Sequence, residues 1–154
     1  MKVLMVCLGN ICRSPMAEGI LRLQAAKAGL NWSIDSAGTG GWHVGERPDH
    51  RAIAAARRAG TDISNQVARQ VSPGDLDRFD LILAMDLSNL RTLMSLSSDP
   101  ACRAKIRLVS EWAFPGEEIE IPDPYYGDDH DFDRVYRLLE QCCKSLIDHY
   151  GAPA

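Results

Sequence analysis

With 154 residues, 45% of them hydrophobic and 25% charged, the chain has the size and composition of one globular domain spanning residues 1–154. Its formal net charge of −4 argues against a nucleic-acid-binding surface, because such surfaces usually carry an excess of Lys and Arg. No apolar run approaches the roughly 20 residues of a membrane span and no signal-peptide pattern begins the chain, so we expect a cytoplasmic protein without membrane insertion.

The first predicted element is a strand over residues 3–8, VLMVCL, a continuous apolar run too short for a typical helix. A helix follows, with Ser14 as its predicted N-cap and Pro15 as its first residue, and Gly29 ends it. The loop over residues 7–13 therefore joins a strand to a helix.

Strand and helix patterns continue to alternate along the rest of the chain. The predicted elements are a strand over 32–37, a helix over about 49–59, a strand over 79–85, a helix from about 87, a short strand over 106–109 and a final helix over about 131–150. This alternation predicts an α/β fold, with a doubly wound sheet of about four parallel strands flanked by helices. The loops 38–49 and 115–129 are too long to be mere connections and are the candidate walls of a site.

The loop CLGNICR, residues 7–13, lies at the carboxyl end of the first predicted strand, which is where open α/β sheets bind ligands. Amide groups that turn inward before a helix N-terminus form an anion-sized nest, and Arg13 adds a planar fork that matches two phosphoryl oxygens. The same positive surroundings favour the thiolate of Cys7, which is therefore a candidate nucleophile. Gly9 and Asn10 tolerate the positive φ angles that such a loop requires.

Two further residues complete the predicted chemistry. The Ser14 hydroxyl can donate to the Cys7 sulfur and ease its departure when a thiophosphate is hydrolysed. A leaving oxygen needs an acid, and Asp123 is the candidate because Pro122 and Pro124 stiffen its backbone and exclude it from a helix. Taken singly, the cysteine would be a buried hydrophobe and the aspartate a turn residue. Here, however, a strand, the loop and the beginning of a helix follow one another in the order that a phosphate loop requires. This order favours the phosphate-loop interpretation.

Neither cysteine nor histidine spacing indicates a metal site. Five cysteines are an odd number in a chain without a secretory pattern, which favours free thiols or a regulated pair over a disulfide framework. Cys142 and Cys143 are adjacent, and the four histidines are scattered. The aspartates of residues 128–133 fit a solvated helix start. We therefore expect no metal and no cofactor.

The chain resembles the low-molecular-weight protein tyrosine phosphatases over nearly its whole length. The likeness rests on CLGNICRS, DSAGTGGWHVGERPD, ARQ, FDLILAMDLSNLR and DPYYG, at residues 7–14, 35–49, 68–70, 79–91 and 123–127. It implies metal-independent hydrolysis of phosphotyrosine or aryl phosphates through a cysteinyl-phosphate intermediate. Proteins that contain phosphotyrosine would be the substrates, and phosphate or vanadate would inhibit.

The resemblance also implies roles for the site residues. Cys7 would be the nucleophile and Arg13 the phosphate clamp. Ser14 would stabilise the thiolate, and Asp123 would act as general acid and then as general base. The residues placed around the substrate are Leu8, Gly9, Asn10, Ile11, Cys12, Ser14, Trp42 and Tyr125, with Tyr126 in support.

A supporting network is implied as well. Ser36 would help to hold Asn10 in a strained conformation, and Cys12 would trap oxidised Cys7 as a reversible disulfide. Members of the family commonly carry a histidine where this chain has Gln66, so we expect weaker support of the loop rather than lost activity.

Three other functions are open at this point. A thiol-dependent arsenate reductase would need extra cysteines for a disulfide relay, and Cys102, Cys142 and Cys143 lie in the wrong setting. A non-catalytic phosphotyrosine-binding protein would not need Cys7 and an acid together. A phosphoarginine phosphatase branch has threonine where this chain has Ile11, whose apolar side chain favours an aromatic phosphoester.

Overall fold

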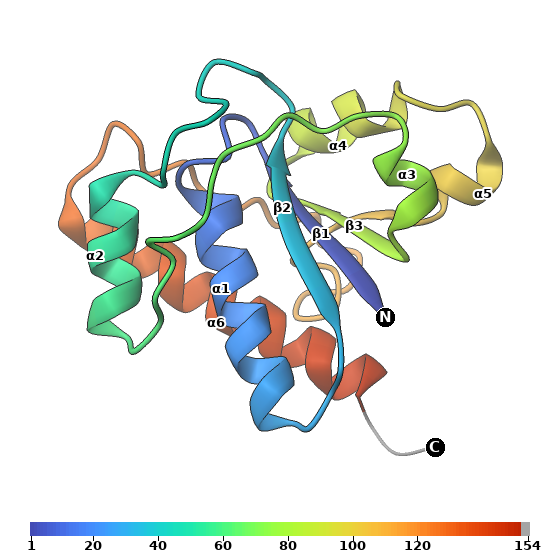
Figure 1. Cartoon of the computed structure of the whole chain (residues 1–154). Helices are drawn as coiled ribbons and strands as arrows, with labels where there is room; N and C mark the ends of the chain where they lie inside the picture. Colours follow the sequence, from blue (N-terminus) through green and yellow to red (C-terminus); the bar gives the residue numbers. More distant parts are fainter. Residues whose placement is uncertain (152–154) are drawn as a thin grey trace.

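Four parallel strands form one sheet in the order β2-β1-β3-β4. Figure 1 shows the first three of them, β2, β1 and β3, side by side. In the computed structural model, which describes residues 1–151, the strands are β1 (Lys2–Cys7), β2 (Ser33–Gly38), β3 (Leu81–Ala84) and β4 (Ile106–Leu108). The predicted parallel α/β sheet is confirmed. Each strand lies within about two residues of its predicted bounds.

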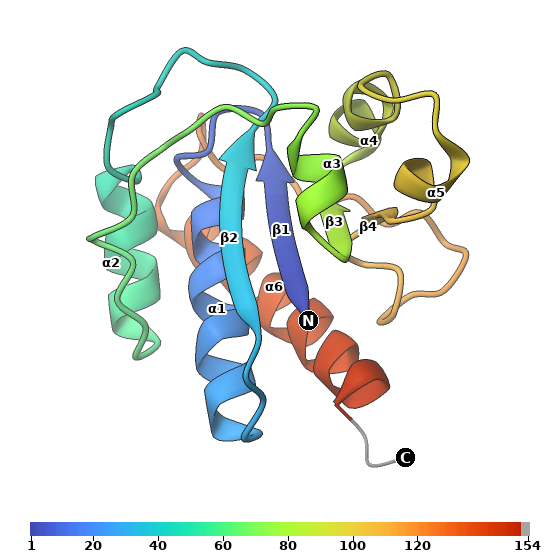
Figure 2. The same ribbon diagram turned by 45° about the vertical axis from the view of Figure 1, so that its right-hand side comes forward.

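Helices cover both faces of the sheet, as the doubly wound prediction requires (Figure 2). The helices are α1 (Arg13–Lys27), α2 (His50–Arg58), α3 (Asp75–Arg78), α4 (Leu87–Met94), α5 (Pro100–Arg103) and α6 (Asp129–Tyr150). Helices α1, α2 and α6 lie on one side of the sheet, and α3, α4 and α5 lie on the other. Sequence patterns did not predict α3 and α5, because a four-residue helix is too short to show a helical period.

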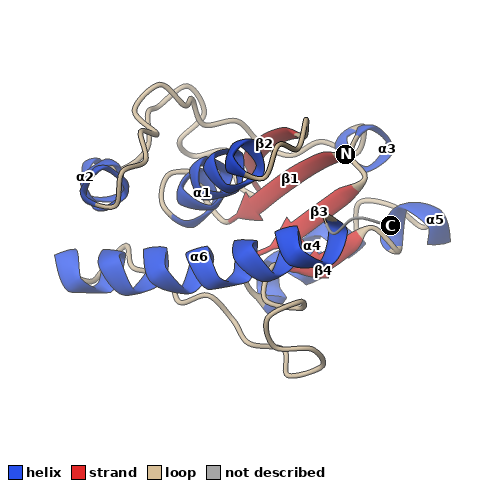
Figure 3. Ribbon diagram, turned by 90° about the horizontal axis from the view of Figure 1, so that it is seen from below, coloured by secondary structure: helices blue, strands red, loops and turns tan. Residues whose placement is uncertain are grey.

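Alternate residues of β1 face two separate cores. Val3 and Met5 belong to the core under α1 and α6, whereas Leu4 and Val6 belong to the core under the short helices of the other face. All four side chains are fully buried. This two-sided burial explains why the strand is an unbroken apolar run rather than an alternating one. Helix α6 runs beside α1 along the first face (Figure 3).

The start of α1 differs from the prediction. The helix begins at Arg13, Cys12 occupies the N-cap position, and no side chain caps the helix. Ser14 therefore lies inside the first turn, and the assignment of Ser14 as N-cap was wrong. Its hydroxyl instead lies 3.0 Å from the Cys7 sulfur, so a tertiary contact takes the place of a local cap.

The acidic start of α6 is more structured than a solvated helix end. Asp128 is the N-cap, and it forms a capping box with Asp131 in which each side chain accepts from the backbone N–H of the other residue. Asp133 accepts a hydrogen bond of 2.7 Å from Arg58 of α2. Among residues 1–151, no helix combines the length and the apolar composition needed to cross a membrane.

The contact of α6 with the first core can be tested at Leu139, which is fully buried. We expect Leu139→Ala to lower the free energy of unfolding by about 2–5 kcal/mol, because it removes apolar contacts and leaves a cavity. Urea denaturation would measure this loss. The exposed neighbour Arg137 provides the control, since Arg137→Ala should change the same quantity by less than ~0.5 kcal/mol. Equal effects of the two substitutions would contradict the assigned packing.

Candidate active site

The loop between β1 and α1 lies where the strand order reverses. Strand β1 pairs with β2 on one side and with β3 on the other, so the crossovers leave its carboxyl end in opposite directions. A crevice at such a switch point is the usual ligand site of a doubly wound sheet. The loop predicted to bind phosphate occupies this point.

Backbone hydrogen bonds orient the loop. The carbonyl of Cys7 accepts from the Thr39 N–H at 2.9 Å, and the carbonyl of Ile11 accepts from the Asp49 N–H at 2.8 Å. By contrast, none of the N–H groups of residues 9–12 donates to another group within residues 1–151. Carbonyls that bond to neighbouring segments and free N–H groups on the same loop form a nest for an anion.

Asn10 adopts the left-handed conformation, with a φ of 59°, as the sequence predicted. Its side-chain amide donates to Ser14 Oγ at 2.8 Å and to Ser36 Oγ at 3.0 Å. Its carbonyl oxygen Oδ1 accepts from the backbone N–H of Arg69 at 3.0 Å. Three hydrogen bonds from three segments thus hold a backbone conformation that an L-residue rarely adopts.

The loop glycine has a different role from the predicted one. Gly9 is not among the residues with positive φ, so its conformation does not require glycine. A Cβ atom there would lie 3.1 Å from the ring of His43, which packs against the loop. Gly38 is more restrictive, because a Cβ atom there would lie 2.8 Å from the Leu8 carbonyl oxygen. Because Gly9 and Gly38 have no side chains, His43 and β2 can approach the loop closely.

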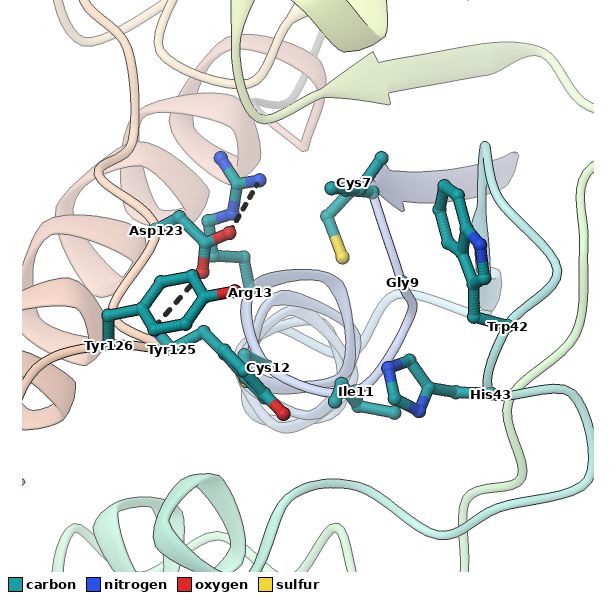
Figure 4. Close-up of a pocket in the computed structure, with 11 residues that line it drawn as sticks. Cys7, Gly9, Ile11, Cys12, Arg13, Trp42, His43, Asp123, Tyr125 and Tyr126 are labelled. Carbon is teal, nitrogen blue, oxygen red and sulfur yellow. Dashed lines mark hydrogen bonds and ion pairs between the residues drawn. The ribbon is translucent and has the colours of Figure 1, made fainter.

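The Cys7 sulfur points into the cavity, with Arg13 and Asp123 on one side and Trp42 on the other (Figure 4). The residue is only 3% exposed, and the Ser14 hydroxyl at 3.0 Å is its side-chain hydrogen-bond partner. A hydroxyl at this distance can donate to a thiolate.

Two acceptors fix the guanidinium of Arg13, whose side chain is 3% exposed. Nη1 donates to Asp86 Oδ2 at 2.8 Å and to the Ile121 carbonyl at 2.9 Å. Nη2 lies 3.8 Å from Asp123 Oδ2. Nη1 is thus occupied, and the remaining N–H groups of the Arg13 guanidinium are left to face an oxyanion. Sequence reasoning did not assign a role to Asp86, although it follows directly after the β3 region and so lies at the same sheet edge as the loop.

The segment that carries Asp123 is tied to α2. Asp123 Oδ1 accepts from the Tyr125 N–H at 3.1 Å, and the side chain is 44% exposed toward the cavity. Arg51 of α2 donates to the carbonyls of Tyr125 at 2.8 Å and Gly127 at 3.1 Å. Its guanidinium also lies over the Phe132 ring, 4.6 Å from the centroid. Sequence reasoning missed Arg51, because no local pattern marks an arginine that binds carbonyls more than 70 residues away.

The two long loops form the walls of a cavity of about 240 Å³, as their length predicted. Trp42 and His43 come from the first loop, and Tyr125 and Tyr126 come from the second. Trp42 is 73% exposed at the rim. The lining residues that the sequence had singled out are Cys7, Leu8, Gly9, Ile11, Cys12, Arg13, Trp42, Asp123, Tyr125 and Tyr126. The side chains of Asn10, Ser14 and Ser36 do not line the cavity, and hydrogen bonds from Asn10 join them to one another.

All five cysteines are free and buried. Burial is the main cause that raises the pKa of Cys12, and the nearby Asp49 carboxylate raises it further, so this thiol stays protonated at neutral pH. Burial likewise raises the pKa of Cys142 to about 11. Within residues 1–151, no group of three or more His, Cys, Asp or Glu side chains gathers to hold a metal ion.

Gln66 does not reach the Asn10 network. Its Nε2 donates to the Pro15 carbonyl at 3.0 Å, whereas its Oε1 is buried without a partner among the described residues. The amide thus steadies the first turn of α1 and makes no hydrogen bond to Ser36.

These features define a class of site. A loop with free N–H groups and a guanidinium fixed by two acceptors lie at one cavity, together with the Cys7 thiol at its base and the Asp123 carboxyl on its wall. This arrangement suits an oxyanion that is held beside a thiol and a carboxyl group.

Comparison with known proteins places the chain within this class. The family model described as low molecular weight phosphotyrosine protein phosphatase matches residues 2–152. The human protein of that name is 44% identical over 149 residues, covering 95% of this chain and 93% of that protein. A protein tyrosine phosphatase structure from Entamoeba histolytica matches with a TM-score of 0.90 and 36% identity, over 96% of this chain and 94% of that one. A drosophila arginine phosphatase structure matches with a TM-score of 0.90 and 37% identity over 100% of both chains.

The chain belongs to the low molecular weight phosphotyrosine protein phosphatase family. The resemblance inferred from the sequence motifs is confirmed.

The ion pair between Arg13 and Asp86 generates a prediction about oxyanion binding. We expect Asp86→Asn to weaken inhibition by inorganic phosphate about tenfold, because the guanidinium loses a charged partner that fixes its orientation. Asparagine retains an Oδ1 atom for the α4 cap, where Asp86 accepts from the Asn89 N–H at 2.7 Å, so the start of α4 should be preserved. Inhibition constants measured by competition with an aryl phosphate would test this.

Glu120 supplies a matched control for Asp86. It accepts from the Leu87 N–H at the same end of α4, and Arg13 is not its partner. Glu120→Gln should leave the phosphate inhibition constant unchanged. An equal loss in both variants would show that general negative charge, and not the Arg13 contact, sets the affinity.

Proposed function

We propose that this protein-tyrosine phosphatase hydrolyses phosphotyrosine in proteins, with Cys7 as the nucleophile. The observation that carries the proposal is that Cys7, Arg13 and Asp123 meet at one cavity although they come from β1, the start of α1 and the loop before α6. Cys7 lies at the base of the N–H nest, next to the position that the phosphorus of a bound phosphate would take. Asp123 lies on the wall, where the ester oxygen would leave.

The reaction proceeds in two steps under this proposal. The Cys7 thiolate attacks phosphorus, the bond from phosphorus to the phenolic oxygen breaks, and Asp123 gives its proton to that oxygen. Water then attacks the cysteinyl phosphate, Asp123 takes the proton of that water, and the thiolate leaves. Arg13 and the N–H groups bind the equatorial oxygens in both steps. The Ser14 hydroxyl stabilises the departing thiolate.

The cavity walls support an aromatic phosphoester as the substrate. Trp42 and Tyr125 offer aromatic faces, and the apolar side chains of Leu8 and Ile11 line the same cavity. A tyrosine ring would bury apolar surface against these side chains while its phosphate reaches the nest. Phosphate and vanadate would occupy the nest as inhibitors. The five free thiols fit a reducing compartment, so we place the protein in the cytoplasm.

The alternative substrates are less well supported. An arsenate reductase must pass a disulfide outward, but Cys102, Cys142 and Cys143 are buried, and none of them lines the cavity. The drosophila arginine phosphatase shares the fold. Ile11 places an apolar side chain in the cavity, which suits a tyrosine ring better than a guanidinium group.

The role of Cys7 is tested by Cys7→Ser. We expect this variant to lose turnover of an aryl phosphate while it still binds vanadate or phosphate, because the N–H nest and Arg13 remain. Steady-state assays and isothermal calorimetry would measure the two properties. Retained turnover would remove Cys7 from the role of nucleophile. Lost binding in a folded variant would show that the sulfur, and not the nest, holds the anion.

The role of Asp123 is tested through the leaving group. We expect Asp123→Asn to slow the hydrolysis of phosphotyrosine about 10²- to 10⁴-fold, because general-acid catalysis typically contributes that factor. An activated ester whose phenolate leaves unaided should be slowed much less. The alkaline fall of kcat/KM in the wild type should flatten in the variant, since no acid remains to lose its proton.

Asp129 provides the control for Asp123, because it lies in the same acidic segment and does not line the cavity. Asp129→Asn should leave unchanged the hydrolysis rates of both substrates and the alkaline limb of the pH profile of kcat/KM. Equal slowing of good and poor leaving groups by Asp123→Asn would exclude it as the general acid.

A further inference from the structure

A second cavity, the rear cavity, lies between α6 and the segment that carries Asp123. Its volume is about 420 Å³, compared with about 240 Å³ for the active-site cavity. Along the segment, Tyr125 and Tyr126 line the active-site cavity, whereas Pro122 and Pro124 line the rear cavity. Asp123 lines both. The residue proposed as the general acid therefore lies between two separate cavities.

Apolar side chains line the rear cavity from both sides. Pro122 and Pro124 come from the segment, and Val135 and Leu138 come from α6. Val135 and Leu138 are three positions apart, so they lie on the same face of the helix. Pro124 and Val135 are buried, and Leu138 is half-buried. The hydrocarbon part of a small ligand would bury apolar surface against these four side chains.

Arg134 is the charged group of the rear cavity that a ligand can engage. It is exposed, and within residues 1–151 its guanidinium forms neither an ion pair nor a side-chain hydrogen bond. The Asp131 carboxylate, one turn earlier in α6, accepts from the Asp128 N–H at 2.9 Å instead. The Asp123 carboxylate is turned to the active-site cavity, where it lies 3.8 Å from Arg13 Nη2 (Figure 4). A planar guanidinium without a partner matches the two oxygens of a carboxylate.

We propose that the rear cavity binds a small organic acid, whose carboxylate pairs with Arg134 and whose apolar body lies against Pro124 and Leu138. The binding itself does not depend on the proposed reaction. Its effect on catalysis rests on the proposed role of Asp123, because an occupant contacts the prolines on either side of this residue. Proton transfer tolerates little displacement of the donor, since a misplacement of about 1 Å can cost about 10²-fold in rate. Occupancy therefore lowers kcat and leaves the N–H nest free for the phosphate.

Phenylbutyrate is the probe, because it joins a carboxylate to an apolar ring through a flexible chain. It is titrated into the full chain in the presence of excess vanadate, so that the N–H nest is not available to the carboxylate. We expect saturable shifts of the backbone amide NMR signals of Gly127, Arg134 and Leu138. Phenylbutanol lacks the carboxylate and butyrate lacks the ring. Each should bind about tenfold more weakly or less, because one loses the charged hydrogen bonds and the other loses apolar burial.

Arg134→Gln is the decisive variant, and it should weaken phenylbutyrate binding about tenfold because the charged partner is lost. Arg137→Gln is the matched control, since Arg137 is also exposed on α6 but does not line the rear cavity. It should bind the probe like the wild type. Leu138→Phe tests the apolar wall, because the larger ring takes up space that the probe needs while Arg134 is unchanged. This variant should also bind the probe more weakly, with its thermal midpoint as the check on folding.

Kinetics without vanadate measure the effect on catalysis. Phenylbutyrate should lower kcat for phosphotyrosine at an unchanged KM, and Arg134→Gln should remove this effect. A rise in KM with an unchanged kcat would show that the probe competes at the nest, and it would overturn the proposal. The absence of saturable amide shifts, or equal probe affinity in Arg134→Gln and Arg137→Gln, would overturn it as well. Failure of the proposed function would appear instead as turnover by Cys7→Ser, which involves no probe, so the two failures are distinguishable.

Discussion

The left-handed turn at Asn10 is the constraint on which the site depends. This residue has a φ of 59° in the middle of a loop whose N–H groups at residues 9–12 donate to no other group within residues 1–151. This conformation is strained for an L-residue. Three hydrogen bonds of the Asn10 side chain, with Ser14, Ser36 and Arg69, offset the strain. The shape of the loop therefore relies on side chains that do not line the cavity.

Arg69 extends this support into a second polar cluster. Its guanidinium binds the fully buried carboxylate of Asp75 through two hydrogen bonds, and it also contacts Asp35. These contacts hold the segment that presents the Arg69 N–H to Asn10. Hydrogen bonds from Arg69 lower the pKa of Asp75 against the opposing effect of its burial. The buried carboxylate of Asp75 is thus satisfied by Arg69, which helps to fix the geometry behind the loop.

The remaining parts of the site reach the loop from distant segments. Asp86 accepts a hydrogen bond from Arg13, which lies 73 positions away in the sequence. Arg51 binds the backbone carbonyl of Tyr125, which lies 74 positions away. The parallel sheet makes the first of these contacts possible, because β1 and β3 are neighbours whose carboxyl ends meet at one edge. The second contact ties the wall that carries Asp123 to α2. Two rigid elements thus set the distance between the thiol and the carboxyl.

Sequence alone determined the parts whose signal is local. The apolar run of β1, the loop CLGNICR and Asp123 between two prolines are each encoded within about ten residues, so their periodicity and backbone limits could be read directly. The tertiary structure decided the rest. It turned the Ser14 hydroxyl to the Cys7 sulfur instead of to a helix cap, and it gave Asp86 and Arg51 their partners. No local pattern could show these contacts, because a charged side chain finds its partner only after the sheet order has set which chain segments meet.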